Sequence, residues 1–412
     1  MALGRQERPR KRPCRSGPGD PRAAGLRVSL RLSAGRIVLN TAIVCASLGL
    51  AAGATEIFIR LFSPVRYHPL VPSAERGLFW QYDEHLGWLH RPGASGRFRK
   101  AGVFDTQVTI NSRGFRGREH LDEAPPGVRR ILVLGDSIVW GYGVEDDEVF
   151  TSVLEREDAG LEWINLGVSG YGTDQESLLL EREGMRYKPD IVLAEVCEND
   201  FDENVHDQVY HIYPKPLFAL RQGSLLLTNA PVPRVSLLDR LFYRLETGSY
   251  LWRLVNSYRI SGRILDALKR CARGAGLSRS VPLPLSSPDQ PEQLLVSLLG
   301  RTKRIAESNG ARLALFIVAP MPQPHRALVS RFGEREGVAV IDLDPIFSRA
   351  VSDEGSSALF LRGDLHWTAE GHRVVARALE EWLEQSGALG SRRPSQRPPS
   401  QPGEPAVVRA PA

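Results

Sequence analysis

The sequence is poor in cysteine, which excludes a disulfide framework as the basis of its fold. Its 412 residues contain four cysteines, and Cys14 and Cys45 lie before and inside an apolar N-terminal segment. Cys197 and Cys271 are the two that could meet outside that segment, and no pattern in the sequence favours a bond between them.

A strong charge of one sign is absent from most of the chain. The whole chain carries a net charge of +5, but residues 1–36 hold ten arginines and lysines against two acidic residues, a net charge of +8. The remaining residues therefore carry a net charge of −3. A mildly acidic body offers little to a phosphate backbone, so we expect no nucleic-acid partner.

Two nucleotide-binding patterns are missing as well. Glycines follow Ser137 in "GDSIVWGYGV", but the segment has neither the G-x-G-x-x-G of a dinucleotide site nor the Lys-Ser/Thr ending of a P-loop. The histidines lack the carboxylate and cysteine neighbours of a metal site, and we predict no metal and no cofactor. The histidines considered are His85, His90, His366 and His372.

Residues 37–59, "IVLNTAIVCASLGLAAGATEIFI", are the one segment that is apolar over about the length that spans a bilayer. We interpret them as a single-pass membrane anchor. The positive-inside bias then places the basic leader in the cytoplasm and the rest of the chain on the exoplasmic side, periplasmic or extracellular. A cleaved signal peptide is an alternative, because Ala52-Gly53-Ala54 resembles a cleavage site, and a buried core helix is another.

Apolar runs that are too short for helices and show no alternation indicate buried strands of a parallel sheet. Helical stretches separate them, which predicts an α/β fold of the flavodoxin-like kind rather than a barrel. The five runs are Ile131–Leu134, Trp163–Leu166, Ile191–Val196, Leu313–Val318 and Val338–Leu343.

The pattern also predicts how the chain is divided. Residues 60–128 contain a linker and a small β-rich preface, in which Phe104–Ile110 alternates like a half-exposed strand. The main domain covers 129–385, with an insertion at about 202–291 that holds a hairpin-like "FALRQGSLLLTN" and a helical stripe from Ser236. Proline, serine and arginine dominate 386–412, which predicts a disordered tail.

The ends of the predicted strands carry the polar residues of a catalytic site, because ligands bind at the carboxyl ends of parallel strands. Strand one ends at Gly135-Asp136-Ser137, strand two leads to Gly170, and strand three ends near Asn199. Asp364 and His366 lie just before the last helix, in "GDLHWTAEGH". A serine hydroxyl, an imidazole base and a carboxylate that orients it are the groups that acyl transfer needs.

An acyl-transfer site also needs donors for the developing oxyanion. The backbone N–H groups of Ser137 and Gly170 and the side-chain amide of Asn199 could supply them.

These blocks resemble those of the SGNH or GDSL hydrolase superfamily, in the order Gly135-Asp136-Ser137, Gly170 within "GVSG", Asn199 within "END", and Asp364 with His366. The resemblance implies a three-layer fold around a parallel sheet. By the same resemblance, Ser137 is the nucleophile and contributes to the oxyanion hole with Gly170 and Asn199, while His366 is the base that Asp364 orients.

The resemblance extends over about Arg130 to Leu383 outside the insertion, and the anchor with its aromatic preface is similar to membrane-anchored bacterial members. Two positions depart from the family pattern. Asp-x-His-Trp replaces the common Asp-x-x-His, as in the branch that contains alginate O-acetylation proteins. Cys197 and Glu198 stand where a glycine usually precedes Asn-Asp, which leaves the substrate open.

Each candidate residue has a structural alternative. Ser137 could cap a helix, and Asp200 is expected to be structural. Glu195 is unusual in an apolar strand, and we expect it to pair with an arginine rather than to support the site. His372 falls on the last helix and is expected to be a packing residue, and Cys197 is not expected to be a nucleophile.

The sequence thus predicts a membrane-anchored serine esterase acting on an acyl ester, on cell-envelope carbohydrate or lipid. The first alternative is an O-acetyltransferase of extracellular polysaccharide with the same residues, which would pass the acyl group to a sugar hydroxyl instead of water. The second is a non-catalytic polysaccharide-binding protein that keeps the fold.

Overall fold

A computed structural model describes residues 21–62, 74–210, 212–252 and 290–389. The chain divides into two compact units. The first contains Met1–Pro69 and Gly248–Arg263, and the second contains Leu70–Thr247 and Ile264–Ala412.

The first unit is built on one long helix, α1 (Pro21–Phe62). Its segment Arg36–Phe62 is long and apolar enough to cross a membrane, with a mean hydropathy of 1.9, and none of that apolar window is buried. The helix has a polar end at Glu56, whose carboxylate accepts hydrogen bonds from the backbone N–H groups of Tyr250 and Leu251, at 2.9 and 2.7 Å. This helix is the candidate membrane anchor.

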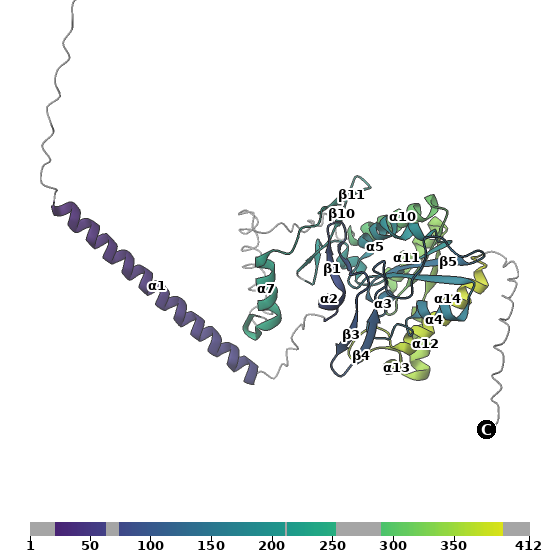
Figure 1. Ribbon diagram of the computed structural model, residues 1–412, viewed down its shortest axis with the longest axis horizontal. Coiled ribbons are helices and arrows are strands. Elements are labelled where there is room, and N and C mark those ends of the chain that lie inside the picture. Colours follow the sequence, from purple (N-terminus) through teal and green to yellow (C-terminus); the bar gives the residue numbers. More distant parts are fainter. Residues whose placement is uncertain (1–20, 63–73, 211, 253–289, 390–412) are drawn as a thin grey trace, which may run out of the picture. The chain divides into compact units, whose positions relative to one another are not determined.

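The second unit is built on a five-stranded parallel sheet (Figure 1) with the strand order β13-β12-β7-β5-β6. In chain order this is 2-1-3-4-5, the flavodoxin-like order, as predicted. The order reverses between β5 and β7, and ligands bind at such a switch point. The strands are β5 (Arg129–Gly135), β6 (Leu161–Gly167), β7 (Ile191–Val196), β12 (Arg312–Ile317) and β13 (Ala339–Asp342).

Helices cover both faces of the sheet, which gives three layers. Alternate strand residues face opposite cores: Leu132 and Leu134 pack with residues of α5, α10 and α11, whereas Ile131 and Val133 pack with residues of α4, α12 and α14. Because both faces are covered, the strands are continuously apolar. The helices are α4 (Phe150–Glu157), α5 (Thr173–Arg182), α10 (Gln290–Ser308), α11 (Gln323–Glu336), α12 (Asp344–Glu354) and α14 (Ala369–Ser386).

Shorter helices complete the second unit and lie at the turns between these elements. They are α3 (Ser137–Trp140), η1 (Gly184–Tyr187), α6 (Asp200–Glu203) and α13 (Ser356–Leu359).

The preface, the segment predicted to be β-rich, consists of a short helix and two antiparallel hairpins. It shares one core with the main domain: the ring of Phe98 lies 6.0 Å from that of Trp140, and Phe79 lies 5.9 Å from Trp140. The elements are α2 (Ala74–Phe79), β1 (Trp80–Asp83), β2 (Gly87–His90), β3 (Ser95–Lys100) and β4 (Phe104–Thr109).

The insertion after β7 contains the predicted hairpin and helix. Its described part packs on the body, where Val205 and Phe218 join a small core with Leu294 and Leu298 of α10. Residues 253–289 and 390–412 lie outside the described residues, so the predicted tail stays a prediction. The elements are β8 (Gln208–Val209), β9 (Tyr213–Pro214), β10 (Leu217–Arg221), β11 (Ser224–Thr228) and α7 (Leu237–Gly248).

Candidate active site

Ser137 lies at the sharp turn where β5 ends and α3 begins, at the switch point of the sheet. Asp136 is the N-cap of α3, and its carboxylate accepts the Ile138 N–H at 2.8 Å. The interpretation of Ser137 as the helix cap is therefore wrong. Its hydroxyl points instead to His366, with 2.7 Å between Ser137 Oγ and His366 Nε2.

His366 joins Ser137 to Asp364. The imidazole Nδ1 lies 2.5 Å from Asp364 Oδ1. Half-burial raises the pKa of Asp364, but the hydrogen bond and charge of His366, together with Lys100, outweigh it and hold that pKa well below its usual range. Asp364 is thus a carboxylate that accepts a hydrogen bond from the Nδ1–H group, which leaves Nε2 to accept the hydrogen bond of the Ser137 hydroxyl.

Lys100 and Tyr142 complete this part of the site, and neither was predicted from the sequence. Lys100 Nζ on β3 lies 2.7 Å from Asp364 Oδ2. The Tyr142 ring stacks on the His366 imidazole, with 4.2 Å between ring centres. Tyr142 follows Ser137 by only five residues, so its place near the nucleophile could have been suspected from the sequence. The contact of Lys100 with Asp364 joins residues 264 positions apart, and no local sequence pattern predicts it.

Gly170 and Asn199 lie at the ends of the neighbouring strands. Gly170 has a φ of +77°, a left-handed conformation that favours glycine. Among the described residues, no acceptor binds the backbone N–H groups of Ser137 and Gly170. The Asn199 amide Nδ2 donates to Asp136 Oδ2 at 3.1 Å, so the amide lies beside the serine turn. The backbone N–H groups of Ser137 and Gly170 and the Asn199 amide are thus potential oxyanion donors at the carboxyl edge of the sheet.

Glu195 supports the serine turn rather than pairing with an arginine, so that part of our expectation is wrong. Its Oε2 accepts the Asp136 N–H at 2.9 Å, and a Cβ on Gly135 would collide with the same oxygen. The carboxyl approaches the turn because Gly135 has no side chain. A backbone N–H partner leaves no pattern in a sequence, so the sequence could not predict this contact.

A group of buried carboxyls surrounds this turn. Burial, followed by the charge of neighbouring carboxylates, raises the pKa values of Glu176 and Glu195 well above the usual range. Burial also raises the pKa of Asp200 to about 7, although its Oδ1 and Oδ2 accept the backbone N–H groups of Thr173 and Cys197. Asp200 thus has the structural role that was expected.

One set of potential metal ligands occurs in the described residues: Asp136, Glu195 and Cys197 offer atoms within 4.8 Å of one another. Asp136 and Glu195 already accept N–H groups of the serine turn and Asn199. Burial and the neighbouring carboxylates raise the pKa of the Cys197 thiol well above its usual value, which disfavours the thiolate that metals prefer. The donor set fits a hydrogen-bonded support for Ser137 better than a metal.

His372 is buried and packs against Phe150, with 5.9 Å between parallel rings. Burial lowers its pKa to about 3, so it stays neutral in the core. The prediction of a packing residue is confirmed.

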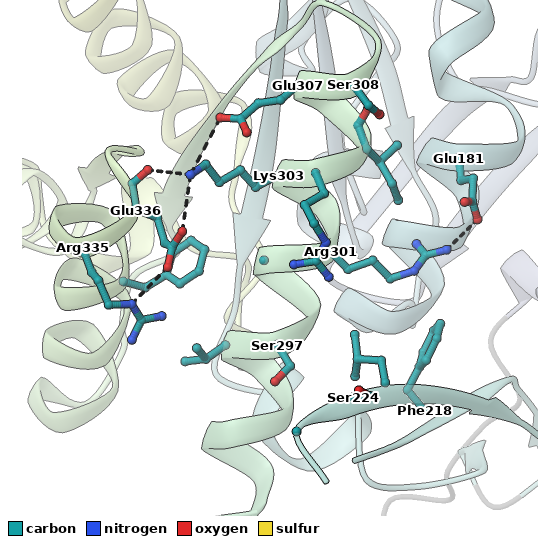
Figure 2. A pocket seen from close by; sticks show the side chains of 17 residues that line it. Glu181, Phe218, Ser224, Ser297, Arg301, Lys303, Glu307, Ser308, Arg335 and Glu336 are labelled. Carbon is teal, nitrogen blue, oxygen red and sulfur yellow. Dashed lines mark hydrogen bonds and ion pairs between the residues drawn. The ribbon is translucent and has the colours of Figure 1, made fainter. Parts of the chain in front are cut away.

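A surface groove of about 920 Å³ lies away from Ser137, between α10, α11 and the β10–β11 hairpin (Figure 2). Its charged side chains are largely paired with one another. Lys303 contacts Glu307 and Glu336, and Arg301 contacts Glu181. The groove contains none of the candidate catalytic or oxyanion residues and is not the candidate active site.

One family model matches most of the second unit. The model of the GDSL-like Lipase/Acylhydrolase family matches residues 133–374, more than half of the chain. A search of the curated proteins gave no match.

Solved structures resemble the chain at low identity. A member of the lipolytic protein G-D-S-L family from Veillonella parvula has 12% identity and a TM-score of 0.35, covering 63% of this chain and 100% of that one. The lipase/acylhydrolase from Enterococcus faecalis has 13% identity and a TM-score of 0.34, covering 63% and 97%. A catalytic mutant of an acetylxylan esterase from Geobacillus stearothermophilus has 15% identity and a TM-score of 0.33, covering 63% and 95%.

The family match, with its Gly-Asp-Ser turn on a flavodoxin-like sheet, identifies the chain as a member of the GDSL-like lipase/acylhydrolase family, within the SGNH hydrolase superfamily.

Proposed function

We propose that the protein is a serine esterase that cleaves ester-linked acyl groups through an acyl-Ser137 intermediate. The observation that carries the proposal is the hydrogen-bonded chain from Ser137 Oγ through His366 to Asp364, with separations of 2.7 and 2.5 Å. A nucleophile, a base and an orienting carboxylate in that order are the arrangement that activates a serine hydroxyl.

In the first half of the reaction, Ser137 Oγ attacks the ester carbonyl carbon while His366 Nε2 takes the hydroxyl proton. The carbonyl oxygen becomes an oxyanion, which the backbone N–H groups of Ser137 and Gly170 and the Asn199 amide stabilise. The tetrahedral intermediate expels the alcohol, which takes the proton from His366. Asp364 stabilises the imidazolium that forms between these steps.

In the second half, water gives a proton to His366 and attacks the acyl-Ser137 carbonyl. The second tetrahedral intermediate releases the acid, and the proton returns to Ser137 Oγ. If a sugar hydroxyl takes the place of water, the same residues transfer the acyl group. This O-acetyltransferase reaction is the alternative, and the acceptor decides between them.

The test compares full-length protein in detergent with Ser137→Ala, using p-nitrophenyl acetate and a serine-directed fluorophosphonate. We expect hydrolysis and stoichiometric labelling of the parent and neither in the variant. Ser352→Ala, an exposed serine on α12, is the control and should keep both. A folded parent that neither hydrolyses nor labels would favour the non-catalytic polysaccharide-binding alternative.

We further propose that the substrate is a carbohydrate or lipid ester of the cell envelope, because the candidate anchor α1 would hold the enzyme at a membrane. The basic leader would remain in the cytoplasm. Protease treatment of intact and permeabilised cells tests this orientation: an exoplasmic domain is digested once protease passes any outer barrier, whereas a cytoplasmic one survives until the inner membrane is opened.

Acetate release from O-acetylated glycans, compared with acetate gain by unmodified glycans in the presence of an acyl donor, separates hydrolysis from transfer. If neither glycan changes while lipid esters are cleaved, the carbohydrate substrate is excluded.

A further inference from the structure

Arg76, on the preface helix α2, has a guanidinium surrounded by aromatic rings. Its guanidinium lies over the ring of Tyr210, with 3.9 Å from Cζ to the ring centre, and also near Tyr213 and Trp80, at 4.7 and 5.3 Å. Three aromatic side chains therefore hold the planar guanidinium in place through cation–π contacts.

Arg76 has no hydrogen-bonding partner in the described part of the chain. Its Nε is buried without a partner, the half-buried side chain leaves its terminal nitrogens accessible, and none of the described residues forms a hydrogen bond or ion pair with its guanidinium. Two fully buried arginines among the described residues differ: Arg116 binds Asp146 and three backbone carbonyls, and Arg130 binds Glu162 and three backbone carbonyls. Because buried donors are normally satisfied, the buried Nε of Arg76 lacks a partner that a ligand could supply.

Tyr210 links Arg76 to the oxyanion site. A Cβ on Gly170 would lie 2.8 Å from Tyr210 Cε2, so the Tyr210 ring lies against the glycine whose N–H is a proposed oxyanion donor. Tyr210 is 41% exposed. The Arg76 guanidinium is therefore one aromatic ring away from the position proposed for the ester carbonyl.

Glu75 is the acidic neighbour that could neutralise Arg76. Its side chain is buried and accepts the Trp80 indole N–H at 3.1 Å. Burial raises the pKa of Glu75, while the Ser169 hydrogen bond and the charge of Arg76 lower it. In the described part of the chain Glu75 binds Trp80 and forms no ion pair with Arg76, so the guanidinium remains open to another anion.

We propose that Arg76 binds an anionic group of the substrate, a carboxylate or a phosphate, close to the ester that Ser137 attacks. The inference rests on the proposed esterase function and adds a substrate class to it. The guanidinium offers two parallel N–H donors that match either anion, and the aromatic rings fix its plane. An ester on an acidic sugar and an ester on a phosphate-bearing lipid are the two sources of such a group.

The experiment measures kcat/KM of the full-length enzyme for two matched pairs of esters. One pair is O-acetylated methyl glucuronoside and O-acetylated methyl glucoside, and the other is monoacetyl glycerol 3-phosphate and monoacetyl glycerol. We expect the anionic member of at least one pair to be preferred by about 10- to 100-fold, the range of a hydrogen bond to a charged group. The pair that shows the preference identifies the source.

In Arg76→Gln the preference should fall to near unity, mainly through a higher KM for the anionic ester. Arg234→Gln is the matched control, because Arg234 also stacks on a tyrosine, 4.1 Å from the Tyr82 ring centre, and should leave the preference unchanged. The proposal would be overturned if Arg76→Gln lowered kcat/KM equally for the anionic and the neutral ester of a pair. It would also be overturned if the parent preferred neither anionic ester.

Binding to Ser137→Ala separates this proposal from the esterase proposal. Methyl glucuronoside or glycerol 3-phosphate should bind that variant, and adding Arg76→Gln should abolish the binding, whether or not the parent turns over ester. If the parent hydrolyses neutral esters but neither anion binds, the anion site is wrong and the esterase function stands.

Discussion

Lys100 places a positive charge beside the carboxylate that orients the catalytic imidazole. Its ammonium lies 2.7 Å from Asp364 and 5.9 Å from the centre of the Tyr142 ring. The ammonium and the imidazole bind different oxygens of the same carboxylate, so Lys100 helps to fix the orientation of Asp364 against His366. Lys100 is thus a positioning residue.

We predict that Lys100→Met lowers kcat by about two- to fivefold, a modest loss because Lys100 is partly exposed and such an ion pair contributes about 1 kcal/mol or less. Lys100→Arg should keep most of the parent activity because it keeps the charge. Arg99→Met is the control, since Arg99 lies on the same strand and pairs with Asp105 instead. A Lys100→Met variant with the kcat of the parent would show that the ion pair does not position Asp364.

Trp88 connects the preface to the oxyanion loop. Its indole N–H donates to the Ser169 carbonyl at 3.2 Å, and the Tyr171 hydroxyl donates to the Trp88 carbonyl. The Ser169 carbonyl and the Gly170 N–H belong to one planar peptide group, so a bond to the carbonyl also fixes the direction of the N–H. The preface therefore orients a proposed oxyanion donor.

Trp88→Phe should lower kcat by about tenfold with little change in KM, less than the 10²–10³ lost when an oxyanion donor is removed outright. Trp163→Phe is the control because Trp163 is buried in β6 and its indole N–H has no partner among the described residues. If both variants lose the same activity, the effect comes from the smaller ring and not from the hydrogen bond.

The insertion is held to the main domain by a fully buried ion pair between Lys215 and Asp174. Asp174 lies in the first turn of α5, and Lys215 lies between β9 and β10. Removing one partner of a buried pair leaves an uncompensated charge in the core.

We expect Lys215→Met to lower the free energy of unfolding by about 3–5 kcal/mol, and the double variant with Asp174→Asn to recover a substantial part of that loss. Chemical denaturation followed by tryptophan fluorescence measures both. Lys188→Met removes an exposed pair with Glu123 and should cost about 1 kcal/mol or less. A similar small loss for Lys215→Met would mean that the core accommodates Asp174 alone.

The elements of the sheet could be predicted from the sequence because strands buried on both faces are uniformly apolar. The catalytic roles of Ser137, Asp364 and His366 could be predicted because these residues lie in two short family motifs, Gly-Asp-Ser and Asp-x-His. The contacts of Lys100 and Trp88 could not be predicted, because they join distant parts of the chain and lie outside any periodic pattern. Glu195 is unusual in an apolar strand, but its partner is a backbone N–H that no sequence pattern reveals.

The second unit contains several buried carboxyls with raised pKa values. Such groups lower the free energy of unfolding as the pH rises toward neutral. Asp200 is a measurable example, since burial raises its pKa from 3.8 to about 7. The folded protein holds this proton between about pH 4 and pH 7, whereas the unfolded chain has lost it. Because the unfolded state binds fewer protons there, the free energy of unfolding decreases as the pH rises through that window.

We predict that the protein is more stable at pH 5.5 than at pH 7.5, and that Asp200 contributes about 2 kcal/mol of this difference. Asp200→Asn should reduce the difference, since its side chain does not titrate. Thermal unfolding midpoints at the two pH values, for the parent and the variant, test the prediction. The same pH dependence in both proteins would assign the effect to other groups.

The aromatic core that the preface shares with the main domain limits how the protein can change during evolution. Phe79 and Phe98 pack on Trp140, which follows Ser137 by three residues and lies inside the family-matched segment. A chimera that takes the preface from one relative and the sheet from another would mismatch this core at the turn that carries the nucleophile. We therefore expect the two segments to be inherited and to vary together, although only one of them bears the family signature.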